Sequence, residues 1–545
     1  MGVDQSEALP PASAPAEAEP ETRPGRRLAL NTAFFSFATG LSRVAGLVRE
    51  VVAASYFGVT GAMSAFTIAF QVPALMRALF ADAALQGAFV PVFTELLEKG
   101  ERKEAFRVAS GLFFLISLVL GALTALFFLV APLVVPLFAP GFSEPLTDLT
   151  IKLSFLLFPM VLLIALSGLV VGMLNSFEHF SAPALAPLAW NLVIVAFLVG
   201  LTPALPEEDQ IYGYAIGVLV GTVVQLLLPM PWLRGRGGRF TVSFDFRNPY
   251  VIRVLKLMLP VTIALGFINF SQLINSLFGT LVQTEAPAAI DKAFRIYMLP
   301  QGIFAVAVAT ILFPTLARYA ARGERDNLRR TMANGVRQLC LLMIPSAVLI
   351  AVLAEPITRL VYERGVFDAE ATDLVAEAMF WWAFSLPFQG VSLLFSRTFF
   401  SLQRPWATTA AAAGNLVVNA LVALALYKPF GVAGIVIGTV VGTITLCLSQ
   451  ALLLRPDLGG VEGRATLAAA ARMLLAALPL GIISYLVWRG LDGALGRSLI
   501  AQTLAVGTAI TAGGAAYAAG VWAMRVPEAQ QIVRLFGGRF RRSNR

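Results

Sequence analysis

The chain has 545 residues, of which 58% are hydrophobic and 13% are charged, and its mean hydropathy is +0.77. Soluble domains carry roughly 25% charged residues, so this composition excludes a water-soluble globular enzyme. The net charge of +9 is spread over short loops between apolar runs rather than gathered in one domain. It therefore indicates the orientation of the chain in a membrane, and not a nucleic-acid partner.

Residue types that build metal or catalytic centres are scarce. Cys340 and Cys447 lie in apolar runs, where we expect buried free thiols rather than a disulfide or a metal ligand. His179, the single histidine of the chain, lies in a short loop and is expected to be an interfacial polar residue. We therefore predict no catalytic residues, no metal site and no cofactor.

The chain begins with a polar segment and continues with apolar runs. Residues 1–28 are rich in Pro, Ala and Glu without apolar periodicity, which predicts a disordered cytoplasmic tail. The runs that follow are long enough to cross a hydrocarbon core of ~30 Å. Because they are continuous rather than alternating, they predict helices and not a β-barrel. Fourteen spans are expected, at residues 29–57, 62–95, 107–137, 147–176, 184–203, 210–233, 250–282, 287–318, 332–354, 371–402, 406–427, 431–454, 467–489 and 498–524.

The charges of the loops predict the orientation of the spans. Clusters of Lys and Arg follow the second, sixth and eighth spans, and residues 525–545 form a basic tail. The loop after the first span has no Lys or Arg, and the loop after the fifth span carries three acidic residues at 207–209. By the positive-inside rule, both termini are expected to be cytoplasmic.

Charged residues inside the predicted spans are candidate functional residues, because a central Arg costs ~2.5–3.5 kcal/mol in a membrane helix. Arg43 lies deep in the first span, and Glu50 follows seven residues later, so these two share a helix face. Arg49 points about a third of a turn away from them. The first span therefore presents charge toward the protein interior.

Two further arginines lie beside predicted helix breaks. In the second span, Arg77 follows Pro73 and precedes Asp82. In the eighth span, Arg295 precedes Pro300, and prolines at membrane depth kink or break a helix. Broken helices near buried charge are a common way for transporters to build substrate sites.

The arginines have alternative interpretations that the sequence leaves open. Arg49 could snorkel at the outer interface, and the other three could form buried ion pairs with Glu50, Asp82 or Asp291 that only fix packing. Several arginines from separate helices with few acids instead predict a cationic cavity. A phosphate suits such a cavity, because the guanidinium fork matches its oxygens.

Neutral polar and small residues are found in later spans. Asn415 and Asn419, four residues apart in the eleventh span, either line a polar pathway or hydrogen-bond to a neighbouring helix. Glycines from Gly431 to Gly438 are expected to let helices pack closely. The seventh, eleventh and twelfth spans contain no carboxylate, so a conventional acidic cation site is not expected in them.

Several motifs resemble the MurJ (MviN) family of lipid II flippases. The runs LSRVAGLVREVVAASYFG (41–58) and AFTIAFQVPALMRALFADAALQGAFVPVFTELLEKG (65–100) resemble the opening of the family. Later matches follow in the family's order and are LNSFEHFSAPALAPLAWN (174–191), RIYMLPQGIFAVAVATILFPTLAR (295–318), LVYERGVFDAEAT (360–372) and FFSLQ (399–403). The opening motif is the specific one, and the later motifs support it.

The resemblance implies an all-α polytopic membrane fold of the multidrug/oligosaccharidyl-lipid/polysaccharide (MOP) exporter superfamily. Two six-helix lobes, at residues 29–233 and 250–454, would surround a central cavity. Two additional helices at residues 467–524 would form a groove for the polyprenyl tail of the substrate.

The resemblance also implies roles for individual residues. The essential cavity arginines of the family correspond to Arg43, Arg49, Arg77 and Arg295, which would bind the pyrophosphate and headgroup. Polar residues of the cavity and its gates would be Glu50, Ser64, Asp82, Asn415 and Asn419. Asp82 stands where the family usually has Glu, Ser64 where Asp is common, and Phe294 where an acid is usual. The chain has thus lost acids and kept arginines, which puts in doubt any coupling scheme that relies on those carboxylates.

The function implied by the resemblance is that of a transporter and not an enzyme. It would move undecaprenyl-pyrophosphate-linked peptidoglycan precursor, lipid II, from the cytoplasmic to the outer leaflet of the bacterial cytoplasmic membrane by alternating access. Lipid II and membrane lipids are the expected partners, and a monomer is expected. Coupling to voltage, sodium or protons and contacts with the cell-wall synthesis machinery stay open. A flippase for another undecaprenyl-linked glycan, such as an O-antigen, capsule or exopolysaccharide unit, is the alternative.

Overall fold

The structure is a computed structural model that describes residues 23–80, 83–236, 241, 243 and 245–530. Regular secondary structure within these residues is helical throughout, as the continuous apolar runs predict. In chain order the elements are α1 (Arg23–Phe57), α2 (Gly61–Phe80), α3 (Ala83–Glu98), α4 (Arg102–Phe138), α5 (Glu144–Leu157), α6 (Met160–Ser176), α7 (Ser181–Gly200), η1 (Thr202–Ala204), η2 (Glu207–Asp209), α8 (Gln210–Leu227), η3 (Met230–Leu233), α9 (Pro249–Val282), α10 (Ala286–Pro300), the π-helical turn η4 (Gln301–Ala305), α11 (Val306–Ala321), α12 (Arg325–Val352), α13 (Ala354–Tyr362), α14 (Ala369–Ala383), α15 (Leu386–Ser401), α16 (Pro405–Leu458), α17 (Gly463–Leu495) and α18 (Leu499–Ala523).

The helices agree with the predicted membrane spans. Each of the fourteen predicted ranges is mainly helical, apart from residues 81–82, which lie outside the described residues. By length and apolar character, nine helices of the described part qualify as spans, or ten if the bent pair α14 and α15 is one span. The predicted tail lies outside the described residues up to residue 22, and its last residues belong to α1, which begins at Arg23. The chain is therefore a multi-pass helical membrane protein.

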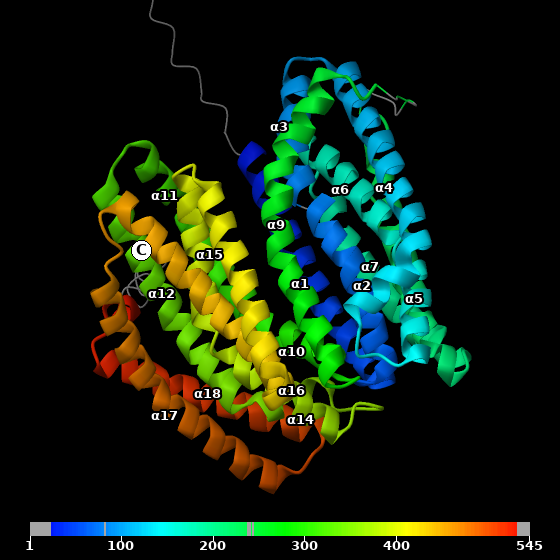
Figure 1. Ribbon diagram of the computed structural model, residues 1–545. Helices are drawn as coiled ribbons and strands as arrows, with labels where there is room; N and C mark the ends of the chain where they lie inside the picture. Colours follow the sequence, from blue (N-terminus) through cyan, green and yellow to red (C-terminus); the bar gives the residue numbers. More distant parts are fainter. Residues whose placement is uncertain (1–22, 81–82, 237–240, 242, 244, 531–545) are drawn as a thin grey trace, which may run out of the picture.

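Helices α1 to α8 form one bundle, and α10 to α16 form a second (Figure 1). The helix between them, α9, packs on both. Val251 and Val254 near its start are buried in a core cluster shared with α3, α4 and α6. Nearer its end, the Nδ2 atom of Asn275 donates to Thr439 of α16 at 2.9 Å. Helix α9, which the prediction places in the second lobe, thus contributes to the packing of both bundles.

Helix α16 contains the predicted eleventh and twelfth spans, which are separated at Gly431. Its backbone angles there are φ +56° and ψ −132°, a conformation that glycine adopts without steric cost. The second half of α16 folds back on the first. The two halves pack so closely that a Cβ atom at Gly438 would lie 2.9 Å from the backbone nitrogen of Ala423. The prediction that these glycines allow close helix packing is confirmed.

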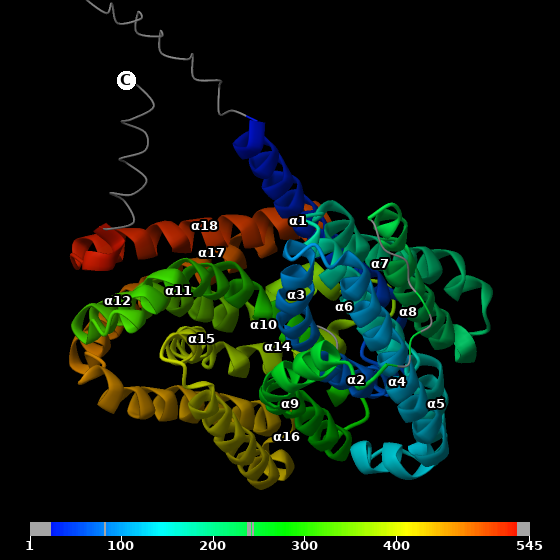
Figure 2. The ribbon, with the colours of Figure 1, turned by 90° about the horizontal axis from the view of Figure 1, so that it is seen from above.

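Helices α17 and α18 form an antiparallel pair at one edge of the molecule, next to α12 (Figure 2). The Ser484 hydroxyl of α17 donates to the carbonyl of Ala509 in α18 at 3.0 Å. The Tyr517 hydroxyl of α18 donates to the carbonyl of Leu341 in α12 at 3.0 Å. These bonds attach the pair to the second bundle.

The close approach of α17 to α18 requires a glycine at position 513. A Cβ atom there would lie 2.9 Å from the backbone oxygen of Leu480 and 2.0 Å from the Ser484 hydroxyl oxygen. We expect Gly513→Ala to destabilise the protein by ~1–3 kcal/mol through overpacking, measured as a lower thermal unfolding midpoint in detergent. Gly514→Ala is the matched control, since no atom lies within 4 Å of its Cβ position. An unchanged midpoint for Gly513→Ala would contradict the tight packing.

Candidate substrate site

A cluster of charged side chains joins α1 of the first bundle to α10 of the second. The Nη1 atom of Arg295 lies 3.0 Å from Glu50 Oε1, and its Nε atom lies 2.8 Å from Asp291 Oδ2. The same Glu50 oxygen contacts Nη2 of Arg49. One carboxylate from the first bundle therefore binds an arginine from each bundle, and we name these four residues the Arg–Glu cluster.

The members of this cluster differ in burial. Arg49 is 8% exposed and Glu50 is 4% exposed, whereas the Arg295 side chain is 32% exposed. The guanidinium of Arg49 stacks on the ring of Trp190 at 4.6 Å, and the Trp190 indole donates to Thr222 Oγ1 at 3.2 Å. Arg49 thus points into the protein, and the alternative in which it snorkels at an interface does not describe this structure.

Arg43 lies two turns before the Arg–Glu cluster on α1 and is exposed. Its Nη1 atom is 3.6 Å from the position that a Cβ of Gly302 would occupy, in the π-helical turn η4 of the second bundle. No hydrogen bond or ion pair of its side chain occurs among the residues that the structure describes. Its expected face-sharing partner Glu50 is bound instead by Arg49 and Arg295. Within the described part of the chain, Arg43 therefore offers an unpaired guanidinium where η4 replaces regular α-helix.

The predicted site residues of α2 are only partly described. Arg77 lies in α2 after Pro73, but its side chain and the whole of Asp82 lie outside the described residues. Ser64 is fully buried, and its hydroxyl oxygen accepts a hydrogen bond from the backbone nitrogen of Ala288 at 3.3 Å. Ser64 thus connects α2 to the first turn of α10, the helix that carries Arg295.

The two asparagines of the eleventh span form a separate group. They lie in the first half of α16, where they contact α9 and the second half of α16. The Nδ2 atom of Asn419 donates to Asn275 Oδ1 at 3.3 Å, and Thr439 hydrogen-bonds with the same Asn275 side chain. Asn415 packs so closely on Gly442 that a Cβ there would lie 2.4 Å from its Oδ1 atom. Of the two alternatives for Asn419, a hydrogen bond to a neighbouring helix is the one that the structure contains.

Two residues of the cluster region were not predicted as site residues. Lys292 of α10 is fully buried, and Tyr362 of α13 covers it, with the Lys292 Nζ atom 5.4 Å from the ring centroid. Helix α13 was itself missing from the predicted elements, because nine residues are too few for a span. The sequence signal for Lys292 was its position between Asp291 and Arg295, ahead of the break at Pro300.

Next to the cluster, the two bundles meet through backbone contacts that we name the closed end, formed by residues 55–58 and 365–367. The backbone nitrogen of Val366 donates to the Ser55 carbonyl at 2.9 Å. A Cβ at Gly365 would lie 2.2 Å from the same oxygen, and a Cβ at Gly58 would lie 3.1 Å from the Val366 oxygen. Both glycines also have positive φ angles, +63° and +53°. The contact is therefore possible only without side chains at these positions.

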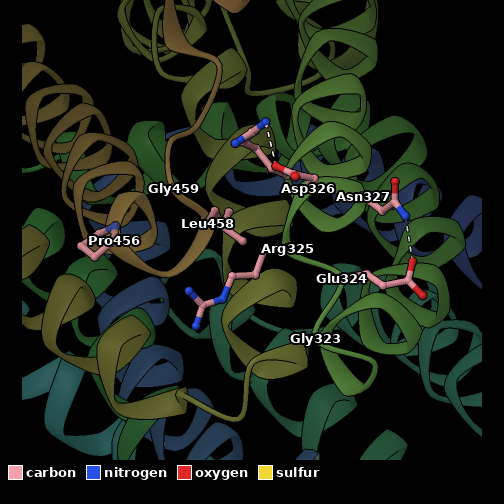
Figure 3. Close-up of a pocket in the computed structure, with 9 residues that line it drawn as sticks. Gly323, Glu324, Arg325, Asp326, Asn327, Pro456, Leu458 and Gly459 are labelled. Atoms are coloured by element: carbon pink, nitrogen blue, oxygen red, sulfur yellow. Dashed lines mark hydrogen bonds and ion pairs between the residues drawn. The ribbon is translucent and has the colours of Figure 1, made fainter.

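A charged pocket of about 510 Å³ lies elsewhere, between the start of α12 and the end of α16 (Figure 3). Its charges are partly paired, since Arg329 Nη2 lies 3.0 Å from Asp326 Oδ1 and Asn327 donates to Glu324 at 2.7 Å. It shares no lining residue with the Arg–Glu cluster. We therefore do not assign the substrate to this pocket.

The structure places the two cysteines and the histidine as follows. Cys340 and Cys447 are buried free thiols, which confirms the prediction for both. His179 lies in the loop before α7, where partial burial and the nearby Arg236 hold the pKa of its imidazole below the usual value. Groups of three or more His, Cys, Asp or Glu side chains that could hold a metal ion are not found among the described residues.

Comparison with known proteins gives consistent matches. The family model described as "Lipid II flippase MurJ" matches residues 53–501. A probable lipid II flippase MurJ of Rhizobium meliloti (strain 1021) is 31% identical over 404 residues, which cover 73% of this chain and 75% of the relative. The lipid II flippase MurJ of Burkholderia cenocepacia is 29% identical over 421 residues, which cover 76% of this chain and 81% of the relative.

Solved structures match the fold. A lipid II flippase MurJ in an inward closed conformation superposes with a TM-score of 0.75 at 22% identity, covering 90% of this chain and 99% of that chain. An inward-facing MATE family transporter of the MOP superfamily gives a TM-score of 0.66 at 16% identity, covering 77% and 96% of the two chains. The expected MOP-type fold is therefore confirmed.

The Arg–Glu cluster makes Glu50 important for stability. Glu50→Gln would leave two guanidinium groups around a neutral acceptor, and breaking a buried ion pair costs ~3–5 kcal/mol. We expect a clearly lower thermal unfolding midpoint in detergent. Asp291→Asn should lower it less, because the Asp291 side chain is 19% exposed and, among the described residues, pairs with Arg295 alone. Equal midpoints for wild type and Glu50→Gln would refute this account.

The closed end makes a second prediction. Gly365→Ala places a methyl group against the Ser55 oxygen in the left-handed backbone region, which alone costs ~1–2 kcal/mol, or a factor of about ten in population. We expect a cysteine introduced at Ser55 to react faster with a membrane-impermeant maleimide in this variant. Gly323→Ala controls for the backbone term, since Gly323 has φ +69° with no atom within 4 Å of its Cβ position. If both variants leave the rate unchanged, the contact is not required for closure.

Proposed function

The chain belongs to the lipid II flippase MurJ family, and from this premise we propose that it moves lipid II from the cytoplasmic to the outer leaflet of the bacterial cytoplasmic membrane by alternating access. Members of this family are transporters and not enzymes. The matching relatives are named lipid II flippases, so the alternative of a flippase for another undecaprenyl-linked glycan is not favoured.

The observation that carries the proposal is the meeting of arginines from both bundles next to a broken helix. Arg49 and Arg295 share Glu50, and Arg43 lies free beside η4. Three guanidinium groups thus lie near only two carboxylates, those of Glu50 and Asp291, which leaves an excess of positive charge. This excess lies on the exposed Arg43, next to the buried ion pairs, where it can attract an anion.

A pyrophosphate fits this arrangement. Its oxygens would accept hydrogen bonds from the free fork of Arg43 and from the exposed part of Arg295, with Arg77 as a further ligand. Glu50 would hold Arg49 and Arg295 in place while the site is empty. Because Arg43 and Arg295 come from different bundles, one bound pyrophosphate would link the two lobes and bias their relative position.

The rest of the substrate would be accommodated around this site. Helix α17 exposes apolar side chains along one face, including Leu478, Ile482 and Leu486, and with α18 it would offer a groove to the polyprenyl tail. The loop charges favour cytoplasmic termini, so the closed end would face outward and the headgroup would enter from the cytoplasmic side. We expect the protein to act as a monomer, with the lobes at residues 29–233 and 250–454 as the moving parts.

The proposal is tested by complementing a bacterium depleted of its own MurJ, with every variant at matched membrane expression. Wild type should restore growth, whereas Arg43→Ala and Arg295→Ala should fail, and flipping of labelled lipid II in proteoliposomes should fall by about tenfold or more, or ~1.4 kcal/mol. Arg253→Ala is the control, because Arg253 forms an exposed pair with Glu95 at 2.8 Å, and such pairs contribute little.

Each alternative result has a defined meaning. Full rescue by both alanine variants would contradict the assignment of these arginines to the substrate. Absence of lipid II flipping by well-expressed wild type in proteoliposomes would contradict the proposed substrate.

A further inference from the structure

Lys292 is a buried charged residue that the proposed pyrophosphate site does not use. Its side chain is fully buried in α10, and its Nζ atom has no hydrogen-bond partner among the described residues. The ring of Tyr362 covers it, with the ring centroid 5.4 Å from Nζ, and the Tyr362 hydroxyl donates to the Lys292 carbonyl at 3.4 Å. The three N–H bonds of an ammonium would therefore have no acceptor here.

Among the described residues, the charges around Lys292 are balanced without it. Those that act on its Nζ atom are Glu50 and Arg49 from α1, and Asp291 and Arg295 from its own helix. Both carboxylates are bound by guanidinium groups, and α13 contributes the neutral phenol of Tyr362. An ammonium would add an unpaired charge to a neutral group of four, whereas an amine adds none. Burial of an unpaired charge is much more costly than burial of a neutral amine.

The wall that covers Lys292 is part of the closed end. Tyr362 is the last residue of α13, and three residues later Gly365 contacts Ser55 of the other bundle. Phe367, which is buried, packs on the Tyr362 ring with centroids 5.6 Å apart. Parting of residues 365–367 from residues 55–58 therefore pulls on the element that shields the Nζ atom from water.

We propose that Lys292 is a proton-binding site whose occupancy is linked to the closed end. With the closed end formed, the uncharged amine of Lys292 is favoured over the ammonium. When the closed end opens, water reaches the Nζ atom, and the amine takes a proton from the aqueous phase on that side. Closing returns this proton to the same phase. The inference rests on the alternation proposed above, but not on the identity of the lipid.

The direction of the pH dependence follows from linkage. The closed state binds one proton fewer than the open state, so raising the pH favours closure. Where Lys292 is charged in the open state and uncharged in the closed state, the ratio of closed to open protein should rise about tenfold for each pH unit. An acidic outer phase would hold the protein open toward that side.

The test is a distance measurement by electron spin resonance on the full chain in nanodiscs. Spin labels at Glu208→Cys in η2 of the first bundle and Glu370→Cys in the first turn of α14 of the second bundle, both exposed positions, report the closed end without touching it. The native thiols Cys340 and Cys447 are buried. For wild type, the closed fraction relative to the open fraction should rise with increasing pH, by up to about tenfold per unit.

Three variants separate the proton site from other causes. Lys292→Met, which is apolar and of similar length, should remove the pH dependence and keep the closed end formed. Lys292→Arg cannot lose its proton and should favour the open state throughout. Lys428→Met is the control, because Lys428 is an exposed lysine near the turn at Gly431, and it should retain the wild-type response.

Two results would overturn the inference: a pH-independent wild type, or an unchanged pH response in Lys292→Met. The wild-type measurement alone decides the first, even if a variant fails to fold. The measurement needs no lipid substrate, whereas the proposed function is tested by lipid II flipping in the Arg295→Ala variant. Failure of one can therefore be distinguished from failure of the other.

Discussion

The shared carboxylate of Glu50 is the interaction on which the arrangement of the two bundles depends. Arginines inside a hydrocarbon layer are costly unless paired, and Glu50 supplies one oxygen to both Arg49 and Arg295. Because these arginines belong to different bundles, compensating their charge also fixes how α1 crosses α10. The need to compensate the charge of these arginines thus determines both how α1 lies relative to α10 and which groups are available to bind an anion.

The same crossing explains why the closed end is next to the site. Helix α10 carries Arg295 and Lys292, and Tyr362 of α13 packs on Lys292. The chain then continues into Gly365, which contacts Ser55 at the end of α1. On the other side of α13, buried Arg359 pairs with Asp492 of α17 and stacks near Trp488. Helix α13 therefore connects the charged cluster, the closed end and the C-terminal helix pair.

The sequence predicts the features that follow from the free-energy cost of placing a residue in the membrane. It misses the features that depend on a contact with a residue far along the chain. Long apolar runs identified the spans, and the cost of charge in a membrane identified Arg43 and Arg295. Helix periodicity, however, suggested that Glu50 shares a face with Arg43, and it could not reveal that Arg295, far along the chain, takes that carboxylate. A nine-residue helix such as α13 is too short to be recognised as a membrane span. Its contacts at the closed end are therefore seen only in the structure.

The balance of charge also constrains how substrate binding can be coupled to movement. Asn275, Asn419 and Thr439 form a neutral polar cluster in which the side chains hydrogen-bond to one another. None of the three carries the negative charge that would attract a cation. The Arg–Glu cluster is different, because its carboxylates occupy arginines that a phosphate would also bind. In the proposed mechanism, an arriving pyrophosphate would compete with Glu50 and Asp291 for Arg295, whereas Arg43 has no side-chain partner among the described residues. Binding would therefore begin at Arg43 and replace the Glu50 contact with a contact through the pyrophosphate, which would couple occupancy of the site to the relative position of the bundles.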